Sequence, residues 1–372
     1  MPRKSNSGMG REKRVGADEP GVAGGIDLTH SRKKTAETIL AVDIGGTKVA
    51  AGLVTSRGRI VSATRGKMMA DGSAADGIAA VCEAIDIVLE KQSGRRISAM
   101  GVGVPGWVDE GSGTVLNAAN LPCWKNFPLA HALQRRYRLP VRVANDAKVA
   151  ALAEAKWGAG RGYRSVFYAT LGTGVGTGLV IGGEIYRGRR GPAGEGGHTT
   201  IDFHGPECVC GKRGCAEMYI SGPAIAREAR AQIAQAPGRD PSAMVKLAGG
   251  EAANISAETV VKAAAAGDSL ARDVLQKTAE RMAVWLGNII DLLEPDAVVI
   301  GGGLAETAIS LLPEVRKSLR QWACSPGYEQ TVIAKAFYGA ESALAGAGAL
   351  WIPRNELRGA RRSRIRSKTS RN

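Results

Sequence analysis

The sequence predicts an α/β protein with two domains and a cleft between them. The chain has 372 residues, enough for two sizeable hydrophobic cores. Apolar segments typical of buried strands run directly into glycine turns. One strand–glycine–strand unit also occurs twice, since Gly46-Thr47 and Gly172-Thr173 stand in similar segments at an offset of 126 residues. This repetition indicates two similar units that face each other, each bringing a glycine turn to the cleft.

The first unit should begin near Glu37. Residues 39–54 predict a strand, a glycine turn and a returning strand. The other elements expected in this half are a strand at 59–63, a helix at 74–92, a strand at 97–104, a helix at 128–138, a strand at 141–144 and an Ala-rich helix at 146–157.

The second unit begins with the hairpin at 165–181. Long helices are expected over about 257–294, then a strand at 297–300 that enters Gly301–Gly303, and a last helix at 341–351. The resulting organisation is an N-terminal tail at 1–37, a small α/β domain at 38–150 completed by 341–353, a large α/β domain at 151–340 and a C-terminal tail at 354–372.

Charge separates the tails from the body of the protein. The net charge is +15, but residues 1–37 hold eight Lys and Arg against five acidic residues, and residues 354–372 hold eight against one. The body is therefore only mildly basic, which suits an enzyme with a polyanionic cosubstrate and argues against specific nucleic-acid binding. We expect a disordered N-terminal tail and a solvated basic C-terminal tail.

The cysteines and the apolar segments indicate a cytoplasmic protein. Three of the six cysteines are clustered, and we expect the scattered Cys82, Cys123 and Cys324 to be buried as small apolar groups. The N-terminus lacks the apolar core of a signal peptide, and no run of about 18 apolar residues is present. We therefore expect a reducing compartment and no membrane association.

The segment Asp43-Ile-Gly-Gly-Thr-Lys48 is the first candidate nucleotide site. The N–H groups of Gly45 and Gly46 can approach phosphate oxygens. Thr47 adds a hydroxyl and Lys48 a cation, while Asp43 can hold Mg²⁺ through water. The segment is not a Walker P-loop, because GxxxxGK[ST] is absent, and a tight β-hairpin would explain this turn equally well.

Two further glycine turns follow apolar strands, and they lie at Gly172-Thr173-Gly174 and at Gly301-Gly302-Gly303. Any one of the three turns is a weak signal. Three turns, each placed after an apolar strand, favour a phosphate-binding cradle over three unrelated turns.

Asn145-Asp146 follows a predicted strand and begins a predicted helix. Asp at this position is often only a helix N-cap. The functional interpretation is a carboxylate that accepts the proton of an attacking hydroxyl during phosphoryl transfer to an alcohol.

A cysteine cluster predicts a structural zinc site. Glu195-Gly-Gly-His198 precedes Cys208-x-Cys210-Gly-x-x-Gly-Cys215-x-Glu217. Three closely spaced Cys, two turn glycines and a nearby His form the ligand set of a closed tetrahedral site, and in a cytosolic protein a metal is favoured over a disulfide. From spacing alone, either His198 or His204 can be the fourth ligand. Four protein ligands leave no open position for catalysis by the metal.

With these motifs in family order, the chain resembles the ROK family of bacterial sugar kinases and repressors over about residues 38–351. The resemblance implies the two-domain actin-like ATPase (ribonuclease H-like) fold, with ATP and Mg²⁺ as cofactors and a homodimer or homotetramer. It implies Asp146 as the base and His198 as the fourth zinc ligand, so that the metal braces the sugar-binding loop. The sugar-lining positions that it implies are Gly106, Asn120, Asn145, Asp146, Glu195, His198 and Glu217.

Two positions depart from the common family pattern. Gly196 replaces a residue that is often bulky and apolar, and Lys148 replaces the last Asn of Asn-Asp-Ala-Asn. Neither is the base or a zinc ligand, so these departures bear on the choice of substrate. The stretch 214–222 is most similar to the glucokinase branch.

The expected function is an ATP-dependent hexose kinase that phosphorylates the 6-hydroxyl of glucose, with N-acetylmannosamine or N-acetylglucosamine as alternative substrates. A sugar-responsive transcriptional regulator of the same family is the alternative from another class. Such regulators carry a DNA-binding module before the kinase-like body, and the 37 residues that precede it here are too few and too polar for that module. A catalytically inactive sugar-binding protein is the third alternative, against which the presence of Asp146 and the glycine turns counts.

Overall fold

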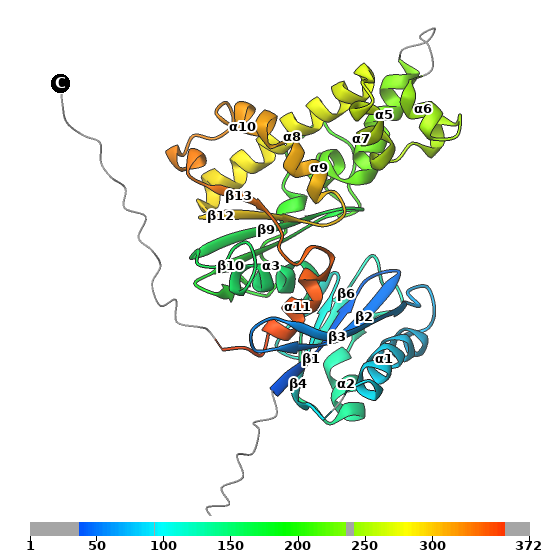
Figure 1. The fold of residues 1–372 in the computed structure, drawn as a ribbon, viewed down its shortest axis with the longest axis vertical. Helices are drawn as coiled ribbons and strands as arrows, with labels where there is room; N and C mark the ends of the chain where they lie inside the picture. Colours follow the sequence, from blue (N-terminus) through cyan, green and yellow to red (C-terminus); the bar gives the residue numbers. More distant parts are fainter. Residues whose placement is uncertain (1–36, 93, 236–241, 354–372) are drawn as a thin grey trace, which may run out of the picture. The chain divides into compact units, whose positions relative to one another are not determined.

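The computed structural model describes residues 37–92, 94–235 and 242–353 (Figure 1). Over these residues the chain forms two five-stranded sheets and one three-stranded sheet. The first large sheet has the order β3–β2–β1–β4–β8. Its strands are β1 (Glu37–Ile44), β2 (Lys48–Thr55), β3 (Ile60–Lys67), β4 (Arg96–Val104) and β8 (Val141–Asn145).

The second large sheet has the order β11–β10–β9–β12–β13. Its strands are β9 (Ser165–Leu171), β10 (Val175–Ile181), β11 (Glu184–Ile185), β12 (Ala297–Gly301) and β13 (Val332–Lys335). Strands β9 and β12 are buried at nearly every position, which explains their continuous apolar sequences.

The two large sheets have the same topology. In each, the central strand pairs antiparallel with the next strand of its hairpin and parallel with a later strand, β4 or β12. In each sheet that later strand also pairs parallel with the strand at the edge, β4 with β8 and β12 with β13. The two similar units indicated by the 126-residue offset are therefore found in the sheet order.

A small sheet extends from the first half and was missing from the sequence prediction. It consists of β5 (Trp107–Asp109), β6 (Thr114–Asn117) and β7 (Lys125–Phe127) in antiparallel order. Its strands are too short to give a clear alternation of apolar and polar residues. The sheet lies in the segment that carries Gly106 and Asn120.

Two helices cover the first large sheet away from the second. Helix α1 (Ala74–Glu90) packs on β2 and β3, and α2 (Leu129–Tyr137) packs beside β8. Helix α1 begins with a capping box, in which Ser73 Oγ accepts from Asp76 N (3.2 Å) and Asp76 Oδ2 accepts from Ser73 N (2.9 Å). This cap explains why the helix begins at Ala74, as the sequence predicts.

Helices α3 (Asp146–Lys156) and α11 (Ser342–Ala349) pack against each other between the two large sheets (Figure 1). Helix α3 lies on β9 and β10, whereas α11 lies on β1 and β4. Almost every residue of both helices is buried. The last described helix therefore returns to the first sheet and packs on the helix that begins at Asp146.

The other helices belong to the second half of the chain. The helical region expected over about 257–294 is divided at Asp268, whose Oδ1 accepts from Ala271 N (3.0 Å) and caps the longer helix. Several helices were absent from the sequence prediction because they are short or their spacing is irregular. The helices of this half are α4 (Glu217–Ile220), α5 (Gly222–Ala234), α6 (Ala243–Leu247), α7 (Ala257–Ala265), α8 (Ser269–Leu293), α9 (Ala305–Ser310) and α10 (Leu312–Leu319).

Apart from Glu37, both predicted tails lie outside the described residues. None of the described helices combines the length and the apolar character needed to span a bilayer. The prediction that the scattered cysteines are buried was wrong for Cys324, which is exposed, while Cys82 and Cys123 are half-buried. The backbone N–H of Cys324 donates to Asp291 (2.9 Å), so this residue lies in a polar surface turn.

Candidate active site and metal centre

Two carboxylates meet where parallel strands of the first sheet end. Asp43 on β1 pairs with Gly103 on β4, and Asp146 follows the last residue of β8. A Cβ placed on Gly103 would lie 3.6 Å from Asp146 Cα and 3.8 Å from Asp43 Oδ1. The two acidic residues therefore flank the same point, at the strand ends where α/β proteins place their ligands.

The N-cap of α3 is Asn145, and Asp146 is the first helical residue. Asn145 Oδ1 accepts from Lys148 N (3.2 Å), while Asp146 Oδ1 accepts from Ala147 N (2.8 Å). The capping role that sequence alone allowed for Asp146 thus belongs to its neighbour. One carboxylate oxygen of Asp146 is left for other chemistry.

Both carboxyl groups bind protons more tightly than usual. Burial raises the pKa of Asp146, and the negative charge of Glu195 raises it further. Burial and the neighbouring Asp146 raise the pKa of Asp43 to about 7, against the opposing effect of Arg65. A carboxylate with a raised pKa is a better proton acceptor, and two adjacent carboxylates favour a nearby cation.

The first glycine turn lies against the small-sheet segment. Gly45 N donates to Lys48 O (2.8 Å) and closes the turn, while Thr47 and Lys48 are exposed. A Cβ on Gly46 would lie 2.7 Å from Asn120 O. Gly46 is therefore required by this close approach alone, apart from any phosphate, and the approach brings Asn120 to the turn.

Gly106 joins the same group of residues. Asn145 Nδ2 donates to Gly106 O (3.1 Å), which fixes the side chain of the N-cap residue. The first half thus gathers the predicted positions Asp43, Gly46, Gly106, Asn120, Asn145 and Asp146.

The second and third glycine turns lie side by side at the end of β9 and β12. Gly301 pairs with Thr170, and Leu304 N donates to Leu171 O (2.9 Å) just beyond Gly302. Gly222 N, at the start of α5, donates to Gly172 O (2.8 Å). A Cβ on Gly172 or Gly303 would meet no atom within 4 Å, so these two glycines leave open space beside the backbone.

Glu217 connects the second turn to the cysteine cluster. Its Oε2 accepts from Val175 N (2.8 Å), and Oε1 lies 3.9 Å from Cys208 Sγ. Glu217 was predicted only as a sugar-lining residue, and the structure adds this support of the Gly172–Gly174 turn.

The segment Glu195–His198 contains a short 3-10 helix, η1 (Gly196–His198). A Cβ on Gly196 would lie 2.8 Å from Phe167 Cζ, and Gly196 O accepts from Trp285 Nε1 (2.9 Å). This packing explains why Gly stands where the family often has a bulky residue. Glu195 is exposed to solvent, yet the surrounding protein raises the pKa of its carboxyl.

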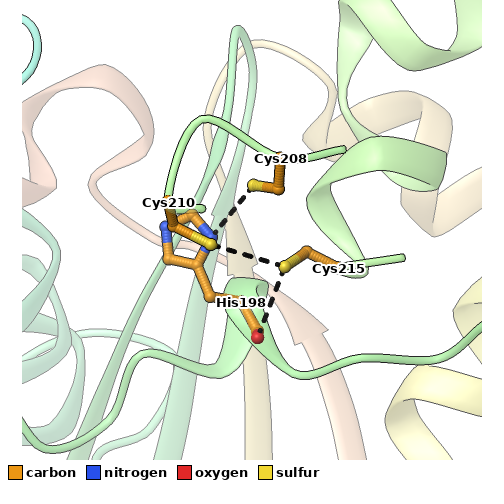
Figure 2. Close-up of side chains that lie close together, drawn as sticks. All are labelled: His198, Cys208, Cys210 and Cys215. Atoms are coloured by element: carbon orange, nitrogen blue, oxygen red, sulfur yellow. Dashed lines mark hydrogen bonds between the residues drawn. The ribbon is translucent and has the colours of Figure 1, made fainter. Parts of the chain in front are cut away.

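His198, Cys208, Cys210 and Cys215 converge on one point (Figure 2). Their ligand atoms all lie within 4.8 Å of one another. Cys208 Sγ lies 3.5 Å from His198 Nδ1, and Cys210 Sγ lies 3.6 Å from Cys215 Sγ. His204 lies outside this group and is exposed, with its ring against Phe203 at 4.0 Å between centroids. Of the two histidines that spacing allowed, the structure places His198 with the cysteines.

These four ligands fit a tetrahedral zinc ion. With Zn–S bonds of about 2.3 Å and Zn–N bonds of about 2.0 Å, neighbouring ligand atoms of a tetrahedron are roughly 3.5–3.8 Å apart. Burial and the adjacent thiols raise the pKa of Cys215 to about 12. A divalent cation would offset the repulsion between thiolates at such a site.

A surface pocket of about 270 Å³ lies elsewhere, between α4, α5 and α8. Its cations already have partners within the protein. Lys277 Nζ pairs with Glu228 Oε1 (2.8 Å), Arg227 donates to the Met218 carbonyl, and Arg281 stacks on Tyr219. None of the predicted site residues lines this pocket, so its size does not make it the candidate active site.

Sequence reasoning missed two buried charges on α3, Lys148 and Glu154. They are 3% and 0% exposed, respectively. Glu154 accepts hydrogen bonds from Ala159 N, Phe337 N, Tyr338 N and Ser342 Oγ at 2.9–3.0 Å. The sequence holds one signal for both residues. The predicted helix at 146–157 is Ala-rich and has no polar face, so a charged residue within it has to be buried.

Two sheets of one topology, each ending in glycine turns, with paired carboxylates at the ends of parallel strands, define a protein of the two-domain actin-like ATPase fold. The sequence profile of the ROK family matches residues 39–354, and the chain belongs to this family. The resemblance and the fold class predicted from sequence are thereby confirmed.

Glucokinases are among the similar proteins. Glucokinase of Streptomyces coelicolor is 35% identical over 313 residues, which cover 84% of this chain and 96% of that protein. The crystal structure of a ROK family glucokinase from Streptomyces griseus in complex with glucose and AMPPNP has a TM-score of 0.72 and 36% identity, covering 84% of this chain and 98% of that one. N-acetylmannosamine kinase of Yersinia pseudotuberculosis is 32% identical over 314 residues, covering 84% and 97%.

Proposed function

We propose that this protein is an ATP-dependent hexose kinase that transfers the γ-phosphoryl group of ATP to the 6-hydroxyl of glucose. The observation that carries the proposal is the position of Asp146, a half-buried carboxylate beside Asp43 at the end of the first sheet. The Streptomyces griseus relative, 36% identical, was solved with glucose and an ATP analogue, which supports these two substrates.

In the proposed reaction, Asp146 accepts the proton of the sugar 6-hydroxyl while O6 attacks the γ-phosphorus. The bond between the γ-phosphorus and the bridging oxygen breaks, ADP leaves, and the proton remains on Asp146 until solvent removes it. Burial suits Asp146 for this task, because it raises the pKa of the carboxyl toward the working range of a general base.

The glycine turns would hold the nucleotide. Backbone N–H groups at Gly46–Thr47, at Thr173–Gly174 and at Gly301–Gly302 can bind phosphate oxygens, since backbone amides in tight turns form anion sites. The N–H groups of Gly45 and Gly172 already donate within their own turns and shape them. Asp43 would hold the Mg²⁺ of the nucleotide through water, and the exposed ammonium of Lys48 would face the transferring phosphoryl group.

The sugar would lie between the first sheet and the loop before η1. Asn145 and Asn120 come from the first half, and Glu195, His198 and Glu217 from the second. Glu195 is exposed to solvent, so its carboxylate is accessible to a sugar hydroxyl.

We further propose that His198 and the three cysteines hold one structural zinc ion. When bound, the metal would fix the positions of His198 and of Glu217, whose carboxylate lies against Cys208. Because all four ligands come from the protein, the metal takes no part in the chemistry. We also propose a cytoplasmic homodimer or homotetramer, which light scattering of the purified protein would test.

The choice among sugars rests on one assay. ADP release should be followed for the purified protein with ATP·Mg²⁺ and each of glucose, mannose, fructose, N-acetylglucosamine and N-acetylmannosamine. We expect the highest kcat/KM with glucose. A higher value with N-acetylmannosamine would favour the alternative that the Yersinia relative suggests. Absence of turnover with every sugar, together with a sugar-dependent gel shift on DNA, would favour a transcriptional regulator instead.

A further inference from the structure

Lys148 is a buried cation for which the proposed mechanism has no role. It lies two residues after Asp146 on α3 and is 3% exposed. Removing an ammonium from water is unfavourable unless a partner compensates for the lost hydration. Burial lowers the pKa of Lys148, and the carboxylates of Glu110 and Glu195 oppose that shift. Such a group stays in a protein interior only where it makes a specific contact.

The contact is with a backbone carbonyl on another segment. Lys148 Nζ donates to Gly191 O, and this is the hydrogen bond that the ammonium makes among the residues that the structure describes. The nearby carboxylate of Glu110 is paired with Arg187 Nε instead (2.6 Å). The Lys148 ammonium therefore binds the backbone at Gly191 rather than a carboxylate.

Gly191 lies in the middle of residues 186–195, the sugar loop, which joins β11 to η1. At its start, Tyr186 N donates to Leu179 O (2.7 Å). At its end, Gly194 O accepts from the hydroxyl of Thr177. Residues 186–190 are exposed, and Arg187 among them pairs with Glu110 (2.6 Å), so the loop is held by polar contacts rather than by packing. The bond from Lys148 is what connects the centre of the loop to α3.

That bond joins the two parts of the proposed sugar site. The sugar loop ends at Glu195, and α3 begins at Asp146. The two carboxyl groups are close enough for the charge of Glu195 to act on Asp146. A loop that moved away from α3 would therefore change the position of Glu195 relative to the proposed base.

We propose that Lys148 is a positioning residue whose ammonium fastens the sugar loop to the helix that begins at Asp146, and so places Glu195 to receive the sugar. The kinetic consequence rests on the proposed function, whereas the fastening itself does not. Lys148 touches neither reacting atoms nor metal ligands in this arrangement; it acts through the loop.

The chain offers a matched control on the same helix. Lys156 is half-buried, its pKa is also lowered by burial, and its Nζ donates to Ile352 O (3.2 Å) and Pro353 O (3.4 Å). Lys148→Met and Lys156→Met therefore each remove one lysine of α3 that donates to a backbone carbonyl on another segment. Only Lys148→Met releases the sugar loop.

The first experiment is amide hydrogen exchange of the full-length protein without substrates. Gly191 N and Ala193 N both donate to Arg187 O, so their protection reports on the loop. Loss of a hydrogen bond to a charged donor should speed their exchange about tenfold or more in Lys148→Met. Lys156→Met should leave them unchanged. Equal protection in Lys148→Met and wild type would overturn the proposal, whether or not the protein is a kinase.

The second experiment separates binding from chemistry. In Lys148→Met, KM for the hexose should rise about tenfold, while KM for ATP should change less than twofold, because the glycine turns lie on other segments. Lys148→Arg keeps a charged donor and should retain most of the loop protection and the low KM. An equal rise in both KM values, or a Lys148→Arg variant as impaired as Lys148→Met, would show general damage and overturn the positioning role. If the wild type has no kinase activity, the proposed function fails, and the exchange experiment alone decides the fastening.

Discussion

The two glycine hairpins of this protein share a topology but differ in what surrounds their turns. In the first, four residues separate the last paired residues, Ile44 of β1 and Val49 of β2. In the second, β9 and β10 are joined by three residues between the paired Leu171 and Val175. The first turn carries its own charges at Asp43 and Lys48, whereas the second has none and receives Glu217 from α4.

The two halves, which share a strand order, therefore have different roles in the proposed reaction. The first half places two carboxylates where charge moves during the proposed reaction. The second half offers glycine backbone and, through the cysteine cluster, the proposed support for the side chains that would bind the sugar. Changes in the first half should therefore act on kcat, and changes around the cluster on KM for the sugar.

The largest effect is expected from Asp146→Asn. The amide keeps the shape and the hydrogen bond from Ala147 N but cannot accept the proton, so kcat should fall about 10²–10⁴-fold. Sugar binding, measured by calorimetry, should be nearly unchanged. A variant that kept half of the wild-type kcat would show that Asp146 is not the base and that the first half does not control the chemical step.

Loss of the proposed metal should weaken sugar binding rather than slow the chemical step. Elemental analysis of protein purified without chelator should find one zinc per chain, and less in Cys208→Ser, Cys210→Ser, Cys215→Ser and His198→Ala. Structural zinc supplies binding energy on the order of 10 kcal/mol in small zinc domains, so each variant should be less stable to heat. KM for the hexose should rise more than KM for ATP. His204→Ala is the matched control, and loss of zinc in that variant rather than in His198→Ala would identify a different fourth ligand.

Glu154→Gln tests the connection between the halves. Glu154 is fully buried and accepts four hydrogen bonds, three of them from residues that lead into α11. The amide turns one acceptor atom into a donor that faces other donors, so the free energy of unfolding should fall by about 3 kcal/mol. Urea denaturation measures this value, with the exposed Glu90→Gln as control. Equal stability of the two variants would mean that the Glu154 carboxylate does not hold residues 337–342 in place.

The pH dependence should show that Glu195 acts on the base from across the site. The base must be ionised, so kcat/KM for the hexose should rise with pH through the pKa of Asp146, which burial raises above that of an ordinary Asp. Glu195→Gln removes a negative charge that raises this pKa further. The acidic limb of the profile should therefore move to lower pH in the variant, although kcat/KM itself falls. If the acidic limb of the profile does not move, the charge of Glu195 does not influence the pKa of Asp146.

The smallest effect is expected from removal of residues 354–372. None of the predicted site residues falls in this segment, so kcat and both KM values should change by less than about twofold. Its net charge of +7 should still matter for adhesion, and retention on heparin at low salt should weaken. A large loss of activity would mean that the tail belongs to one of the two halves.

The sequence by itself determined the central strands of the two large sheets and their glycine turns, and it supplied the candidate site residues. Buried strands and Gly-rich turns leave strong local signals, and for that reason β1, β2, β9, β10 and β12 fall within a residue or two of their predicted positions. The cysteine cluster was equally clear, because its three cysteines and two glycines lie within eight residues.

Only the tertiary structure decided which distant residues meet. It placed His198 rather than His204 with the cysteines, gave the cap of α3 to Asn145, and set Gly46 against Asn120. It also showed why α3 carries charge. Lys148 and Glu154 make their hydrogen bonds to residues 43 and up to 188 positions away, and no local pattern in a sequence encodes a partner at such a distance.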